Sequence, residues 1–171
     1  MSPNLDLEGI DFDCGVPDYN DWLVKHASTA ARSGSASVYL MFEAAQDGAT
    51  SRLSRVVGYF TINPTSVAKV DAPKTVQGGL MRAAPGWMIG KLALDKSLRG
   101  QDPPLGPQLV LAALAQVVEA ANRGGGQVIV VDADNADLIA FYERCGFLST
   151  GVEGQLRLYM KVSTARRYLQ P

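Results

Sequence analysis

The sequence has little cysteine and no long apolar run, and each absence excludes a class of protein. Cys14 and Cys145 are too few for a disulfide framework, so we expect reduced thiols, as in a cytosolic protein. No stretch approaches the roughly 18 apolar residues of a membrane-spanning helix. The N-terminus MSPNLDLEGIDFD is acidic and lacks the basic region and apolar run of a signal peptide. We therefore expect a soluble, cytoplasmic protein with no membrane partner.

An excess of charge of one sign is missing too. Sixteen Lys and Arg residues against seventeen Asp and Glu residues give a net charge of −1. This balance excludes a uniformly basic nucleic-acid-binding surface, although not a local basic patch. The content of 47% apolar and 19% charged residues is typical of a globular protein. At roughly 100–200 residues per domain, the length predicts one domain over residues 1–171.

The N-terminal half predicts a helix followed by two strands. Apolar residues recur at helical spacing over 19–32. Segments 36–44 and 55–63 are rich in strand formers, with a turn signal between them that favours an antiparallel hairpin. Segment 65–85 contains several prolines and glycines without a sustained period, so we interpret it as an irregular excursion that could include a short strand or helix.

The C-terminal half predicts strands that alternate with helices. In chain order we expect a strand over 87–95, a loop over 96–107, a helix over 109–122, a strand over 128–131, a helix over 135–145 and a strand over 156–162. This order of elements indicates an α/β or α+β domain built on one sheet.

One junction in this half has the character of an anion-binding site. The strand ending in Leu92-Ala93-Leu94-Asp95 leads through the glycine-bearing loop Arg99–Gly106 into a helix. Unpaired backbone N–H groups and the positive end of the helix dipole meet at such a junction and suit a phosphate group. By itself the pattern favours a structural turn over an anion site, because strand-glycine-helix junctions are common in α/β proteins.

The segments around this junction resemble a known family. The strand-loop-helix of 92–122, followed by VDADNADLIAFYERCGF, resembles the acetyl-CoA-binding half of the GNAT N-acetyltransferases. The sequence FDCG at 12–15, followed by Asp21-Trp22-Leu23, is similar to the opening of the GNAT-type toxins of bacterial toxin–antitoxin systems. The segment IGKLALD at 89–95 fits the same group. The resemblance covers about residues 10–162.

The resemblance implies a fold and a cofactor site. The GNAT acyltransferase fold is a single mixed, mostly antiparallel sheet, splayed between its central strands and flanked by helices. The pantetheine arm of acetyl-CoA would pair with the backbone of Leu92, Ala93 and Leu94. The pyrophosphate would lie on the loop, where the matching residues are Arg99, Gly100, Gln101, Leu105 and Gly106. Asn135 and Tyr142 match two further positions that contact the cofactor.

The resemblance also implies catalytic roles. Tyr142 occupies the position of the usual general acid, and a phenol of ordinary pKa can protonate the departing thiolate. A main-chain N–H near Leu94 would stabilise the oxyanion of the thioester. No residue is an obvious general base, and no metal is implied. From the residues alone, Tyr142 could instead be a packing side chain and Asn135 a helix cap.

The loop departs from the family pattern, which is shorter. Either Leu105-Gly106 follows an insertion of about two residues, or a proline replaces a glycine in the register Gln101-x-x-Pro104-x-Gly106. Pro103 and Pro104 have no N–H, and Asp102 adds a negative charge. Losing one or two amide donors would weaken cofactor binding by about an order of magnitude.

The expected function is transfer of acetyl from acetyl-CoA to an amine, in this group the α-amino group of aminoacyl-tRNA, which blocks translation. The resemblance further implies a homodimer and a ribbon-helix-helix antitoxin. Because the Lys and Arg residues are scattered, the tRNA acceptor rests on the resemblance and not on charge. One alternative is acetylation of a small amine or a protein N-terminus. Another is a weakly active or inactive GNAT-fold binding module, which the prolines of the loop favour.

Overall fold

The computed structural model describes residues 7, 9–43 and 55–170. The chain divides into two compact units, the first made of Met1–Thr61 and Lys91–Leu109 and the second of Ile62–Gly90 and Val110–Pro171. Strands β2 (Val56–Ala68) and β3 (Ala83–Leu94) and helix α4 (Leu105–Gly124) each contribute residues to both units. A single domain over 1–171 stays a prediction.

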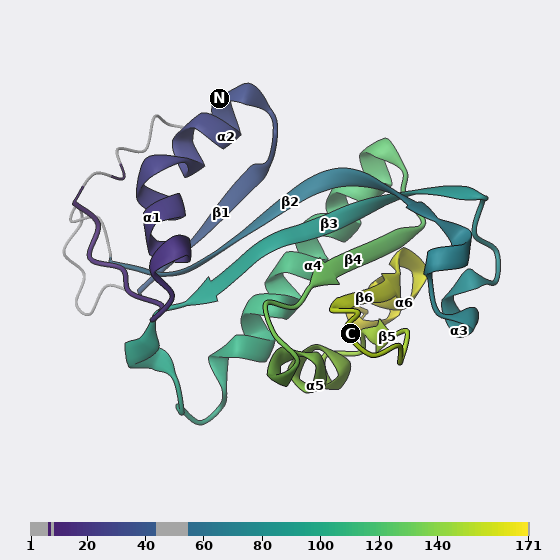
Figure 1. Ribbon diagram of the computed structural model, residues 1–171. Helices are drawn as coiled ribbons and strands as arrows, with labels where there is room; N and C mark the ends of the chain where they lie inside the picture. Colours follow the sequence, from purple (N-terminus) through teal and green to yellow (C-terminus); the bar gives the residue numbers. More distant parts are fainter. Residues whose placement is uncertain (1–6, 8, 44–54, 171) are drawn as a thin grey trace. The chain divides into compact units, whose positions relative to one another are not determined.

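The strands form one six-stranded sheet in the order β1-β2-β3-β4-β6-β5 (Figure 1). The remaining strands are β1 (Ser37–Phe42), β4 (Val128–Asp132), β5 (Leu148–Ser149) and β6 (Arg157–Lys161). Strand β3 pairs in parallel with β4, whereas β6 pairs antiparallel with both β4 and β5. The mixed sheet with its helices confirms the predicted fold class. Successive residues of a strand point to opposite faces, and Val128–Val131 of β4 are all buried, so both faces of this strand are covered and its residues are apolar.

In the first unit, two helices stand where the sequence predicts one. Helix α1 (Pro17–Lys25) and helix α2 (Ala27–Ser33) are separated by His26, whose backbone angles leave the helical region (φ −123°, ψ −24°). Figure 1 shows both helices near β1. Leu23 and Ala27 are both buried in one apolar cluster. Because these residues keep helical spacing across the break, the periodicity does not reveal it.

Segment 65–85 is mostly ordered, so the prediction of an irregular excursion is wrong, whereas the short strand and helix that it allowed for are present. Strand β2 runs on to Ala68, and the short helices η1 (Lys69–Asp71) and α3 (Lys74–Gln77) follow before β3 begins at Ala83. The segment changes from strand to helix to strand within a few residues, so no single period is sustained. Its apolar side chains are buried against β4 and β6 in a cluster that contains Val67, Ala72, Val76, Leu80, Val128, Val130 and Tyr159.

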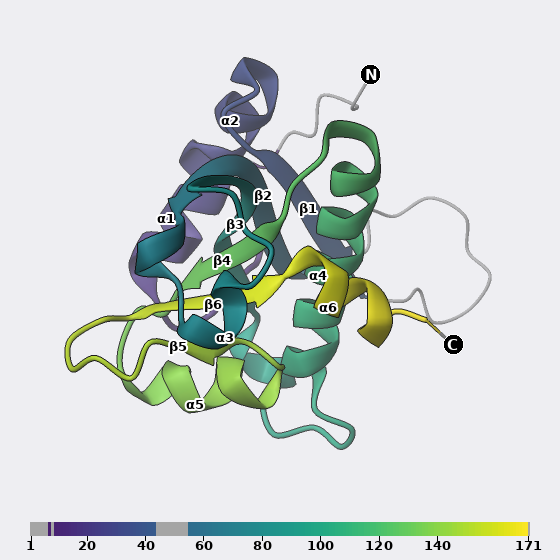
Figure 2. The ribbon, with the colours of Figure 1, turned by 90° about the vertical axis from the view of Figure 1, so that its right-hand side faces the viewer.

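The second unit holds the helices nearest the C-terminus. Helix α5 (Asp137–Arg144) contacts β5 and β6, and α6 (Val162–Tyr168) contacts β6 (Figure 2). Gly146 ends α5 in the left-handed conformation (φ 90°), as predicted for the residue after this helix. Strand β5 and helix α6 are too short to be recognised in the sequence. Among the described residues, no helix is long and apolar enough to cross a membrane.

Candidate active site

The end of β3, in the first unit, is anchored by the buried carboxylate of Asp95. One oxygen accepts hydrogen bonds from the backbone N–H of Ser97 (2.9 Å) and its hydroxyl (2.6 Å), and the other from the Asp13 amide (3.1 Å). The Arg55 guanidinium lies 2.7 Å away. Burial alone would raise the pKa of Asp95, but Arg55, Ser97 and the Asp13 amide hold it well below its usual range. The carboxylate therefore stays charged and fixes the start of the following loop.

Just before this anchor lie the three residues predicted to pair with a cofactor. Leu92 and Leu94 are partly exposed, and Ala93 is buried. The parallel register of β3 with β4 ends at Ile89, so these main-chain groups lie beyond it. On the neighbouring strand, a Cβ at Gly58 would come within 3.2 Å of the Ala93 carbonyl oxygen. A glycine thus lets β2 approach this part of β3 closely, where a larger residue would make the Ala93 carbonyl shift.

The loop after β3 offers backbone donors. The short helix η2 (Lys96–Leu98) leads into Gly100, which has a left-handed conformation (φ 76°). Within the described part of the chain, the N–H groups of Gly100, Gln101 and Asp102 donate to no protein acceptor. Asp102, Pro103 and Pro104 are exposed. The loop thus has three N–H groups ready for an anion.

The first turn of α4 adds fewer donors than an ordinary helix. The first four N–H groups of a helix have no partner within it, but here Pro104 and Pro107 occupy two of those positions. Leu105 and Gly106 are left as the donors of this turn, and both are partly exposed. The reduced number of donors that the sequence predicts is therefore present in the folded loop.

The side chain of Arg99 is directed to the protein itself. Its guanidinium donates to the Cys14 carbonyl oxygen. Lys96 pairs with Asp13 (2.5 Å), and hydrogen bonds from Lys96, Asn20 and the Gly15 amide lower the pKa of Asp13 to about 2. These contacts tie the segment FDCG, at 12–15, to the beginning of the loop. The sequence analysis did not identify Asp13, Arg55 or Asp95 as part of the site.

In the second unit, Tyr142 lies on the buried face of α5 with 6% of its surface exposed. Its ring meets Phe141 and Phe147 edge to face, at centroid distances of 5.1 and 5.9 Å. Burial, with a smaller effect of Asp134, raises the pKa of Tyr142 to about 12. No described residue hydrogen-bonds its hydroxyl group. The side chain therefore packs in the core and also carries a neutral hydroxyl group. The two interpretations of Tyr142, as a packing residue and as a general acid, do not exclude each other.

Asn135 acts as a cap for the same helix. Its side-chain oxygen accepts a hydrogen bond from the backbone N–H of Leu138 (3.2 Å). The residue is exposed. Capping is thus the role that this structure gives it, and a cofactor contact stays a prediction.

The predicted site residues are grouped by unit. The first unit brings together Leu92–Leu94 and the loop Arg99–Gly106, and α5 of the second unit carries Asn135 and Tyr142. Comparison with protein families matches residues 4–147 to the acetyltransferase (GNAT) family. The chain belongs to the GNAT acetyltransferase family.

The relatives of this GNAT chain include toxins. A tRNA-acetylating toxin of Mycobacterium tuberculosis is 30% identical over 136 residues, which cover 80% of this chain and 75% of the relative. A crystal structure of a tyrosine-to-phenylalanine mutant of KacT is 26% identical, with a TM-score of 0.81, and the match covers 97% and 93% of the two chains. AtaT complexed with acetyl-methionyl-tRNAfMet is 25% identical, with a TM-score of 0.79 over 98% and 94% of the chains.

Family membership confirms several predictions. The protein is an acetyl-CoA-dependent N-acetyltransferase of the GNAT family and is similar to GNAT toxins. The extended backbone of Leu92–Leu94 and the five unpaired amides of the loop and first helical turn fit the pantetheine arm and the phosphates of acetyl-CoA. The individual cofactor and catalytic residues stay predictions.

Proposed function

We propose that this enzyme acetylates the α-amino group of aminoacyl-tRNA and thereby blocks translation. The observation that carries the proposal is the 30% identity, over 80% of this chain, to a tRNA-acetylating toxin. The family membership supports the reaction type, and the neutral Tyr142 supports the proton transfer.

Each group of residues has a part in this reaction. The main chain of Leu92, Ala93 and Leu94 holds the pantetheine arm, and the Leu94 N–H stabilises the oxyanion of the thioester. The phosphates lie on the amides of Gly100, Gln101, Leu105 and Gly106, with Arg99 fixing the loop through its contact to Cys14. Tyr142 holds its proton at neutral pH and donates it to the departing thiolate.

The proposal includes partners. By resemblance to the GNAT-type toxins, the enzyme forms a homodimer in the cytoplasm and is inhibited by a ribbon-helix-helix antitoxin. Sedimentation of the purified protein tests the first of these, since a monomer at micromolar concentration would contradict the dimer. A short neighbouring reading frame whose product binds the enzyme and suppresses its activity would support the second.

The acceptor is tested directly with charged tRNA. The enzyme is incubated with acetyl-CoA and bulk aminoacyl-tRNA, and the 3′ ends are analysed for N-acetylated amino acids. We expect acetylated ends with the wild type and a strong decrease with Tyr142→Phe. Efficient acetylation of a small amine or a protein N-terminus, with unmodified aminoacyl ends, would contradict the proposal and favour that alternative.

A further inference from the structure

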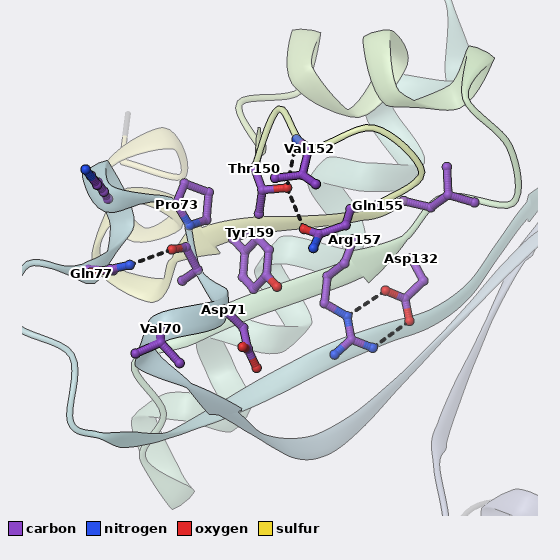
Figure 3. Close-up of a pocket in the computed structure, with 13 residues that line it drawn as sticks. Val70, Asp71, Pro73, Gln77, Asp132, Thr150, Val152, Gln155, Arg157 and Tyr159 are labelled. Carbon is purple, nitrogen blue, oxygen red and sulfur yellow. Dashed lines mark hydrogen bonds and ion pairs between the residues drawn. The ribbon is translucent and has the colours of Figure 1, made fainter.

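The second unit contains a cavity of about 620 Å³, shown in Figure 3. It lies between the segment 70–77, the hairpin residues 150–156 and the adjoining ends of β4 and β6. Its volume is within the range of about 300–1,000 Å³ found for small-molecule sites. None of the site residues predicted from the sequence lines it.

Tyr159 contributes a hydroxyl group to this cavity. Only 3% of the residue is exposed, and its ring packs in the apolar cluster below β4 and β6. Its hydroxyl group points into the cavity in Figure 3 and has no hydrogen-bond partner among the described residues. Burial raises the pKa of Tyr159, so the group is a neutral donor at neutral pH. The hydroxyl group is therefore open to the cavity and available to donate to a ligand there.

Arg157 supplies a second donor in a fixed orientation. Its Nε and Nη2 atoms each lie 2.7 Å from one oxygen of Asp132, a two-bond fork that holds the guanidinium plane in place. The remaining Nη1 atom donates to no other group in the described ranges. Figure 3 shows the guanidinium turned toward the same part of the cavity as the Tyr159 hydroxyl.

Asp71 faces these two donors with an acceptor. Its carboxylate forms no ion pair or hydrogen bond within 7, 9–43 and 55–170, and its charge acts on both Tyr159 and Arg157. Two apolar side chains, Val70 and Val152, also line the cavity and are 82% and 55% exposed. Among the described residues that line the cavity, Asp71 thus offers a free acceptor and Tyr159 and Arg157 offer donors, beside the ammonium group of Lys74 and an apolar margin.

We propose that this cavity binds the aminoacyl end of the acceptor. An aminoacyl ester has an amine next to a carbonyl oxygen, which matches a carboxylate that faces a hydroxyl and a guanidinium. Asp71 binds the amine, Tyr159 and Arg157 donate to the carbonyl oxygen, and Val70 and Val152 contact the amino-acid side chain. A simple alkyl amine has no carbonyl group and would leave both donors unused. The inference rests on the proposed function, and it names the residues that would bind the aminoacyl end of the tRNA.

Single-atom changes test these roles. The variants Asp71→Asn and Tyr159→Phe are compared with Glu153→Gln, an exposed carboxylate of the same hairpin outside the cavity, and with Tyr39→Phe, whose ring stacks on Phe60. We expect the KM for aminoacyl-tRNA to rise by about tenfold or more in the two cavity variants. The KM for acetyl-CoA stays constant, and neither control changes. Circular dichroism confirms that all variants fold.

A binding measurement separates this inference from the proposed function. A non-hydrolysable 3′-aminoacylamino-adenosine is titrated into the enzyme by calorimetry, beside its N-acetylated form. We expect the wild type to bind the free amine more tightly than the acetylated form, and Asp71→Asn to lose this preference. If the wild type acetylates aminoacyl-tRNA but the variants bind and react unchanged, the cavity assignment is wrong while the function stands. If no tRNA is acetylated, the proposed function is wrong. If the analogue also does not bind to the wild type, the assignment of the cavity to the aminoacyl end is wrong as well.

Discussion

At the scale of single residues, the hydroxyl of Tyr142 is the group on which the chemistry depends most. Tyr142→Phe keeps the ring between Phe141 and Phe147, so we expect the fold to be retained. Loss of the proton donor should lower kcat by about 10²–10⁴-fold with little change in the KM for acetyl-CoA. Because the pKa of Tyr142 is about 12, the wild-type rate should not fall through ionisation of this group as the pH rises from neutral to about 10. Steady-state kinetics at a series of pH values measure the decrease in kcat and the pH dependence of the wild-type rate. An unchanged kcat in Tyr142→Phe would refute the role of Tyr142 as the proton donor.

Asp95 acts on the cofactor through the loop that it anchors. In Asp95→Asn, the charge facing Arg55 is lost and at least one of the bonds to Ser97 and the Asp13 amide is weakened. We expect the variant to lose about 1–3 kcal/mol of stability and to raise the KM for acetyl-CoA more than it lowers kcat. The control Asp21→Asn removes an exposed carboxylate paired with Lys25, which is worth about 0.5 kcal/mol or less. Equal kinetic constants in both variants would show that the anchor does not position the loop.

At the scale of elements, the loop between β3 and α4 decides how well acetyl-CoA is held. Replacing Asp102-Pro103-Pro104 by one glycine removes a negative charge, shortens the loop and exchanges the Asp102 N–H for one at the helix start, where proline has none. We expect acetyl-CoA to bind about tenfold more tightly, as measured by calorimetry. The variant Asp102→Asn separates charge from loop length, because it removes only the charge. Weaker binding after the replacement would mean that the prolines hold the remaining amides in a useful position.

The sequence predicts elements well where one period is sustained. Helix α4 and the buried strand β4 appear near the expected positions because their apolar patterns continue over their length. The break at His26 is missed because it preserves the spacing of Leu23 and Ala27, and segment 65–85 is missed because its period changes twice.

Some residues of the candidate site could be predicted from the sequence, and others could not. Tyr142 and the loop belong to local motifs that the sequence shows directly. The bond from the Asp13 amide to Asp95 joins residues 82 positions apart, and the cavity combines Asp71 with residues of β4 and β6. No local pattern encodes such contacts, so only the folded chain reveals these residues.

At the scale of the whole molecule, the carboxylates held ionised by their partners make stability depend on pH. The pKa of Asp13 is lowered to about 2 by Lys96, Asn20 and Gly15, and that of Asp95 is lowered by Arg55, Ser97 and the Asp13 amide despite its burial. A carboxyl whose pKa is lower in the folded than in the unfolded chain stabilises the fold above the unfolded value of about 3.9. This stabilisation is lost as the pH falls through the folded value.

The free energy of unfolding should therefore be nearly constant from about pH 7 to 5 and decrease steadily below about pH 4. Urea unfolding at a series of pH values measures this dependence. In Asp95→Asn the free energy of unfolding should be lower at neutral pH. It should also decrease less steeply below about pH 4, because one of the groups that must take up a proton is gone. Asp21→Asn, which removes an exposed carboxylate, should follow the wild-type curve. If the wild type and Asp95→Asn lose stability in parallel as the pH falls, Asp95 is not the linked group, and its ion pair with Arg55 contributes no acid sensitivity.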